Sequence, residues 1–167
     1  ARSQKNPILG VIRGSGWSND GKGKFVLSPN PGGQKRAYER AFEEAGLHHS
    51  EVNYLECHAT GTPLGDRIEA QSISDFFGEQ LPLTGSVKSN VGHMLTASGM
   101  SSLAKILGAF KSESIPASIR IYNPQLPEDR IVRTPFQWQK TVFPRVGAIS
   151  SFCLLYTSDA ADEHGCV

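Results

Sequence analysis

The chain has 167 residues, of which 38% are hydrophobic, and its 17 Lys and Arg residues nearly balance its 16 Asp and Glu residues. This length and apolar content are typical of one globular domain or a piece of a larger one, and they exclude a chain that is disordered throughout. The net charge of +1, without a basic stripe, argues against nucleic acid or a membrane surface as a partner.

No apolar run reaches the roughly 18 to 20 residues that a membrane span requires, and the first six residues lack the apolar core of a signal peptide. We therefore expect a cytoplasmic protein. Its cysteines, Cys57, Cys153 and Cys166, have neither disulfide nor zinc spacing, so we expect reduced thiols and no metal site.

The first predicted elements are a strand and a helix. A β-prone run over residues 7–13 ends at Gly14 and Gly16, which predicts a strand over 7–13. Apolar residues then recur at helical spacing from Ala37 to Ala45, and Gly46 follows at a C-cap position. The pattern predicts one amphipathic helix that ends at Gly46.

Two similar units come next, each made of a strand, a polar loop with a histidine, and a helix. They are strand 52–57, loop 58–63 and helix 66–77, then strand 83–87, loop 88–93 and helix 94–110. The first half of the last helix consists of small residues, as expected where another backbone packs closely. Alternating strands and helices predict an α/β layered fold.

After proline-rich connectors we predict two short strands, 136–138 and 146–152. Residues 153–167 fit none of this pattern. We interpret them as a non-native tail, such as translated vector sequence, and place the domain at residues 1–152.

His58 and His93 each follow a predicted strand in a polar loop that contains glycine. Because α/β sheets place their ligand sites at the carboxyl ends of strands, the two histidines are expected to share a site. A single histidine in a loop is more often a surface or structural residue, so the hypothesis rests on the pair.

Two motifs carry a family resemblance. Segment 56–66 (ECHATGTPLGD) resembles the first histidine signature of β-ketoacyl synthases, the condensing domains of fatty-acid and polyketide synthases. Segment 85–93 (GSVKSNVGH) resembles their second signature, with a lysine and a histidine five residues apart. Two long motifs in the family order are a specific signal, and the similarity extends from about Ile8 through Phe152.

The resemblance implies the C-terminal half of a thiolase-like α/β fold, which is homodimeric in complete family domains. The activity it implies is a decarboxylative Claisen condensation of an acyl thioester with a malonyl-type extender on acyl carrier protein. No tightly bound cofactor is implied, since the phosphopantetheine arm of the carrier protein brings the substrate. A thiolase, or a non-catalytic partner resembling a chain-length factor, is the alternative.

Site residues follow by their match to the two signatures. His58 and His93 match the pair that donates hydrogen bonds to the thioester enolate, and Lys88 matches the lysine that supports the second histidine. Thr60 and Thr62 match threonines that bind the phosphopantetheine arm. Without the family match, Lys88 would read as a surface lysine and the two threonines as part of a capped turn.

The chain also departs from the family pattern. The family nucleophile, a cysteine in a small-residue elbow, has no counterpart here, so we expect this segment alone to be inactive. Cys57 lies on a predicted strand and is assigned to the core. A glycine-rich loop is missing after Phe152, and Leu95 stands where many modular polyketide synthases have Glu. Asp66 and Glu69 are interpreted as helix-start residues and left out of the site.

Overall fold

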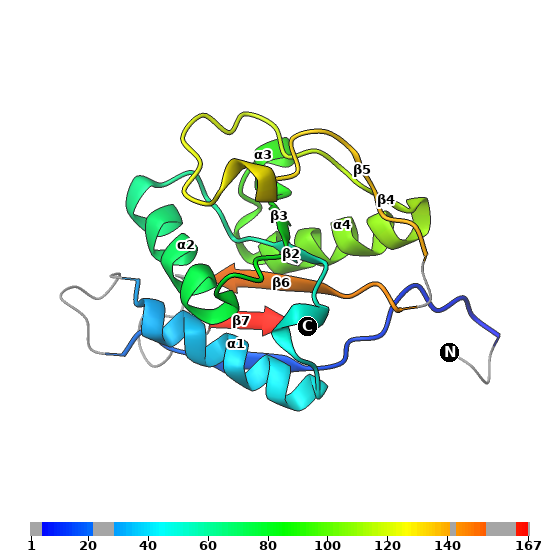
Figure 1. The fold of residues 1–167 in the computed structure, drawn as a ribbon, viewed down its shortest axis with the longest axis horizontal. Helices are drawn as coiled ribbons and strands as arrows, with labels where there is room; N and C mark the ends of the chain where they lie inside the picture. The colour runs from blue at the N-terminus through cyan, green and yellow to red at the C-terminus, as the bar shows by residue number, and fades with distance from the viewer. Residues whose placement is uncertain (1–4, 22–28, 141–142, 153–162, 167) are drawn as a thin grey trace.

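The structure is a computed structural model, and it describes residues 5–21, 29–140, 143–152 and 163–166 (Figure 1). A five-stranded sheet lies at its centre, in the order β1-β7-β6-β2-β3. Its strands are β1 (Ser15–Ser18), β2 (Tyr54–Glu56), β3 (Leu83–Gly85), β6 (Gly147–Phe152) and β7 (Glu163–Cys166). Two further strands, β4 (Ser114–Ile115) and β5 (Phe136–Gln137), pair with each other.

The strand directions bring three chain segments to one edge of the sheet. Strand β2 pairs in parallel with β3 and with β6, and Glu56 stands opposite both Gly85 and Ile149. Strand β7 is antiparallel to β6 and to β1. The carboxyl ends of β2, β3 and β6 therefore lie at the same edge, which is where α/β sheets hold their ligand sites.

Helices cover both faces of the sheet (Figure 1). Helices α1 (Pro31–Ala45) and α2 (Pro63–Phe77) pack with Leu55 of β2 in one apolar cluster. On the opposite face, α4 (Ser98–Ser112) packs with Tyr54 in a second cluster. Since neighbouring strand residues point to opposite faces, this arrangement confirms the predicted α/β layers. The remaining helical segments are α3 (Lys88–Val91) and the 3₁₀ turns His49–Glu51, Leu95–Ala97 and Glu128–Arg130.

Helix α1 ends at Gly46, as its sequence predicts, and it begins at Pro31 after the N-cap Asn30. The Asn30 side chain accepts a hydrogen bond of 2.9 Å from the Gly32 amide, which satisfies one free donor of the first turn. Gly46 ends the helix with φ at 62°, a left-handed conformation that glycine adopts without a Cβ clash.

The predicted strand over residues 7–13 is wrong, because the chain is exposed there and the strand begins only at Ser15. The two glycines that seemed to end the strand allow a close approach instead. A Cβ at Gly16 would collide with the Ala37 carbonyl of α1, and one at Gly14 would collide with Ala41. Glycine in a strand often marks such an approach.

Helix α2 begins at Pro63 rather than at the predicted residue 66, and α4 begins at Ser98 rather than at residue 94. Proline suits a first helical turn, because its missing N–H would be unpaired there in any case. Residues 163–166 form β7, whereas the origin of 153–167 as non-native sequence stays a prediction. None of the helices in the described part of the chain has the length and apolarity of a membrane span.

Candidate functional site

His58 and His93 lie together although 35 positions separate them in the sequence. Their ring centroids are 5.5 Å apart and their planes meet at 87°. His58 follows β2 and is buried, whereas His93 follows α3 and is exposed. Phe152, at the end of β6, places its ring 4.8 Å from that of His58. The loops after neighbouring parallel strands thus bring both imidazoles to the predicted edge of the sheet.

Backbone amides set the orientation of both rings. The Phe152 amide donates to Nδ1 of His58 at 3.2 Å, and the Leu95 amide donates to Nδ1 of His93 at 3.0 Å. A ring nitrogen that accepts a hydrogen bond carries no proton, so a neutral imidazole held in this way has its hydrogen on Nε2. Each ring therefore keeps an N–H donor on the side away from its backbone partner.

The environment of His58 favours the uncharged ring. Burial, together with the nearby Lys88 and His93, lowers the pKa of His58 from 6.5 to about 3. Burial is the largest of these causes, since it penalises the charged form. The imidazole of His58 is therefore neutral at physiological pH and available as a hydrogen-bond donor.

Glu69 of α2 organises the loop that contains His58. Its two carboxylate oxygens accept hydrogen bonds of 2.7 Å from the backbone amides of His58 and Ala59. Burial raises the pKa of Glu69 to about 7, and these hydrogen bonds and one from Ser150 oppose that rise. Glu69 is buried at the base of the site, so the interpretation of Glu69 as a helix-start residue missed its main contacts.

Asp66 of α2 also accepts a backbone hydrogen bond from the loop after His58. Its Oδ1 accepts from the Gly61 amide at 3.2 Å, and burial raises its pKa while this contact lowers it. Thr60 and Thr62 flank Gly61, with their hydroxyl oxygens 3.2 Å apart. Because the Thr62 side chain makes no capping bond to α2, the capped-turn alternative receives no support at this residue.

Lys88 begins α3 and is 7% exposed. Its Nζ has no hydrogen-bond partner among the described residues. Burial lowers the pKa of Lys88, and the charges of Glu69 and Glu56 oppose that effect. The surface-lysine alternative is thus wrong, since a cation is held inside the protein beside two carboxylates.

An open cavity of about 860 Å³ lies beside these groups. Thr60, Lys88 and His93 line this cavity, together with residues 120–126. The described residues include no cluster of three or more His, Cys, Asp or Glu side chains that could hold a metal ion.

Cys57 is buried in the core cluster beneath α1 and α2. Burial raises the pKa of its thiol well above the usual value, with Glu69 and Glu56 adding to the effect. A thiol of this kind is a poor nucleophile, in agreement with the assignment of Cys57 to core packing.

Sequence reasoning also missed Lys105, which forms a buried ion pair with Glu56 at 2.8 Å. Both residues stand in regions that otherwise read as strand or apolar helix. A charge at such a position is itself a signal, because charged side chains are rarely buried unless paired.

The family model described as beta-ketoacyl synthase, C-terminal domain, matches residues 9–122. Among curated proteins, the chain is 36% identical over 163 residues to a phenolphthiocerol/phthiocerol polyketide synthase of Mycobacterium tuberculosis. That match covers 91% of this chain and 9% of the relative.

The chain is also similar in fold to solved structures of ketosynthases. The chain resembles one described as PfaC keto synthase-chain length factor, with a TM-score of 0.87 and 39% identity over 98% of this chain and 18% of the other. It also resembles the ketosynthase from module 6 of the bacillaene synthase of Bacillus subtilis, with a TM-score of 0.87 and 28% identity over 99% and 31%. The chain therefore spans less than a third of each of these relatives.

Proposed function

Because this chain belongs to the β-ketoacyl synthase family as its C-terminal domain, we propose that it supplies the two enolate-binding histidines of a polyketide-type ketosynthase. The supporting observation is the meeting of two imidazoles whose Nδ1 atoms both accept backbone hydrogen bonds. Their Nε2–H groups are the donors that an oxyanion between the rings would need.

The proposed reaction needs such donors at its costly step. A malonyl-type thioester loses carbon dioxide, and the electron pair of the broken carbon–carbon bond passes into a thioester enolate. The enolate carbon then attacks the carbonyl of an acyl group held as a thioester on a cysteine, and the cysteine thiolate leaves. His58 and His93 stabilise the enolate oxygen without changing their own protonation state, since preorganised donors act without reorganisation.

Lys88 and the two threonines have supporting roles in this proposal. The ammonium of Lys88 sets the charge beside the histidines, as the pKa effect on His58 indicates. Thr60 and Thr62 bind the phosphopantetheine arm of an acyl carrier protein. This carrier protein is the proposed partner, and the complete domain is proposed to be a cytoplasmic homodimer.

The nucleophilic cysteine is proposed to lie outside this segment, because Cys57 is buried in the core and no cysteine of the chain stands in a small-residue elbow. The segment alone is therefore proposed to be inactive. The resemblance to a ketosynthase and chain-length factor pair keeps a non-catalytic partner as the second candidate. The sequence of a complete domain that contains this segment separates the two candidates. A cysteine in a small-residue elbow would support the enzyme, and an inert residue at that place would support the non-catalytic partner.

We expect His58→Ala or His93→Ala, in the complete ketosynthase that contains this segment, to lower malonyl decarboxylation by about 100- to 1,000-fold. Acyl loading on the cysteine should survive, because loading does not pass through the enolate. Release of labelled carbon dioxide measures the first step, and mass spectrometry of the acyl-enzyme measures the second.

His48→Ala is the matched control, because His48 is a histidine outside the site, in the cap of the 3₁₀ turn after α1. It should leave both steps unchanged. Normal decarboxylation in either site variant would remove that histidine from the proposed role.

A further inference from the structure

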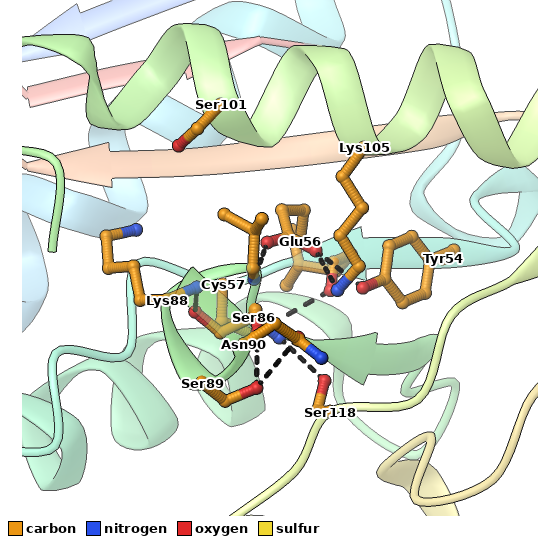
Figure 2. Close-up of polar contacts among 12 residues, drawn as sticks. Tyr54, Glu56, Cys57, Ser86, Lys88, Ser89, Asn90, Ser101, Lys105 and Ser118 are labelled. Atoms are coloured by element: carbon orange, nitrogen blue, oxygen red, sulfur yellow. Dashed lines mark hydrogen bonds and ion pairs between the residues drawn. The ribbon is translucent and has the colours of Figure 1, made fainter. Parts of the chain in front are cut away.

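A buried ion pair contacts the start of the segment 85–93, which contains Lys88 and His93. Nζ of Lys105, on α4, is 2.8 Å from Oε2 of Glu56, and their side chains are 5% and 0% exposed. Figure 2 shows Lys105 reaching from α4 down to Glu56 at the end of β2. Two charges enclosed in this way need compensation by each other and by further hydrogen bonds.

The further hydrogen bonds of Glu56 come from β2 and from the loop. Tyr54 donates its hydroxyl to Oε2 at 2.6 Å, and the backbone amide of Val87 donates to Oε1. Burial raises the pKa of Tyr54, and Glu56 adds to this effect, so the tyrosine stays protonated as a donor. Each carboxylate oxygen of Glu56 is thereby paired.

The loop is also held from its other side. The Ser118 hydroxyl accepts from the Ser86 amide at 3.0 Å, and the Asn90 side chain donates to the Ala117 carbonyl at 2.9 Å. At Gly85 there is no room for a side chain, because a Cβ would lie 2.5 Å from Ser118 Oγ and 2.6 Å from the Tyr54 hydroxyl oxygen. The chain from residue 85 to residue 90 is therefore clamped between the segment 117–118 and Glu56 (Figure 2).

From these contacts we infer that Glu56 and Lys105 are a positioning pair for the proposed reaction: the ion pair fixes the Val87 amide and so places Lys88 and His93 against the enolate. The inference rests on the function proposed above for Lys88 and His93. Glu56 is not among the residues that line the cavity, and it acts through the backbone immediately before Lys88.

The pair also affects the charge of Lys88. Burial lowers the pKa of Lys88, the Glu56 carboxylate opposes this effect and the Lys105 ammonium adds to it. If one partner is neutralised, the other is left as an uncompensated buried charge next to the loop. Removing the charge of Glu56 or of Lys105 alone should consequently lower the decarboxylation rate more than removing both charges.

The test uses Glu56→Gln, Lys105→Met and the double variant in the complete ketosynthase that contains this segment. Each single change should lower kcat for malonyl decarboxylation on the order of 10- to 100-fold, because displacements near 1 Å at a reacting group cost this much. KM for the malonyl thioester and acyl loading on the cysteine should be unchanged. The double variant should recover at least about fivefold over the weaker single variant.

Two further variants guard against a simple folding defect. Lys111→Met makes the same change at an exposed position of the same helix and should have no effect. Tyr54→Phe keeps the ring in the core and removes only the hydroxyl donor, so it should fold and lower decarboxylation about threefold to tenfold. Normal decarboxylation in Tyr54→Phe and in Glu56→Gln overturns the inference, as does an equal loss of loading and decarboxylation.

The two proposals fail in different ways. If His58→Ala and His93→Ala decarboxylate normally, the proposed function is wrong whatever the ion pair does. If those variants lose decarboxylation while Glu56→Gln and Lys105→Met retain it, the proposed function stands and the positioning pair is wrong.

Discussion

At the scale of single residues, the state of His58 depends on groups that are distant in the sequence. Its Nδ1 accepts a hydrogen bond from Phe152, 94 positions away, and its backbone amide is held by Glu69. Burial then lowers its pKa to about 3. The loop motif predicted a functional histidine, whereas its tautomer depends on contacts from β6 and α2.

This pKa has a consequence for stability. Because the folded pKa of about 3 lies below the ordinary value of 6.5, the unfolded chain binds more protons between these values. The contribution of His58 to the free energy of unfolding is therefore fully present above about pH 6.5, and it is lost as the pH falls toward about 3. From about pH 7.5 to about pH 5, the free energy of unfolding should fall by about 2 kcal/mol on account of His58.

Urea unfolding of the complete domain and of its His58→Gln variant, at both pH values, gives the free energy of unfolding of each protein. The change of this free energy with pH should be larger in the unchanged domain, and the difference between the two proteins is the effect of His58. Glu69 has a raised pKa and so contributes with the opposite sign, since its stabilising effect is lost as the pH rises toward about 7. It is present in both proteins and cancels in the comparison. Equal pH dependences would mean that His58 titrates normally.

At the scale of elements, β1 and α1 show how a backbone contact determines the position of a strand. The residues before Ser15 have the higher β propensity, yet the strand forms at Ser15–Ser18. Gly14 and Gly16 allow the backbone of α1 to pack against the chain there, and no other residue type would fit. Close packing of backbones thus outweighs local propensity at this edge of the sheet.

We expect Gly16→Ala to lower the free energy of unfolding by about 3 kcal/mol, because α1 must move to admit the added Cβ. Thermal or urea unfolding of the complete domain measures the change. Gly108→Ala is the matched control, since a Cβ there would meet nothing within 4 Å, and it should raise stability by about 0.5 to 1 kcal/mol through better helix propensity. Similar effects of the two substitutions would contradict the packing explanation.

At the scale of the whole molecule, the segment from residue 91 to residue 100, which includes the exposed His93, carries several large exposed apolar side chains. Val91, Met94, Leu95 and Met100 are between 46% and 70% exposed. Large exposed apolar areas are unusual on soluble monomers. We propose that these four side chains, which we call the 91–100 patch, are covered by another part of the fold in the complete domain.

The chain on its own should therefore associate at micromolar concentration. Analytical ultracentrifugation of the 167-residue chain measures the association, and Val91→Lys combined with Met100→Lys should weaken it by at least about tenfold. Tyr122→Lys, a matched change at an exposed residue outside the patch, should have little effect. A chain that sediments as a monomer at all concentrations would contradict the prediction.

Much of the architecture could be predicted from the sequence alone. The α/β layers, the end of α1 at Gly46 and the two histidine loops follow from periodicity, caps and turn residues, which act over short distances along the chain. The motifs around His58 and His93 also indicated the family, which the comparisons confirm.

The tertiary structure decided what depends on contacts between distant segments. It placed β1 at Gly16, where α1 approaches, and it showed that Glu69 supports the His58 loop rather than only starting a helix. It also revealed the pairing of Lys105 with Glu56. These features could not be predicted from the sequence, because burial and hydrogen bonding depend on which segments are in contact in the folded chain. The pattern and spacing of residues do not specify those contacts.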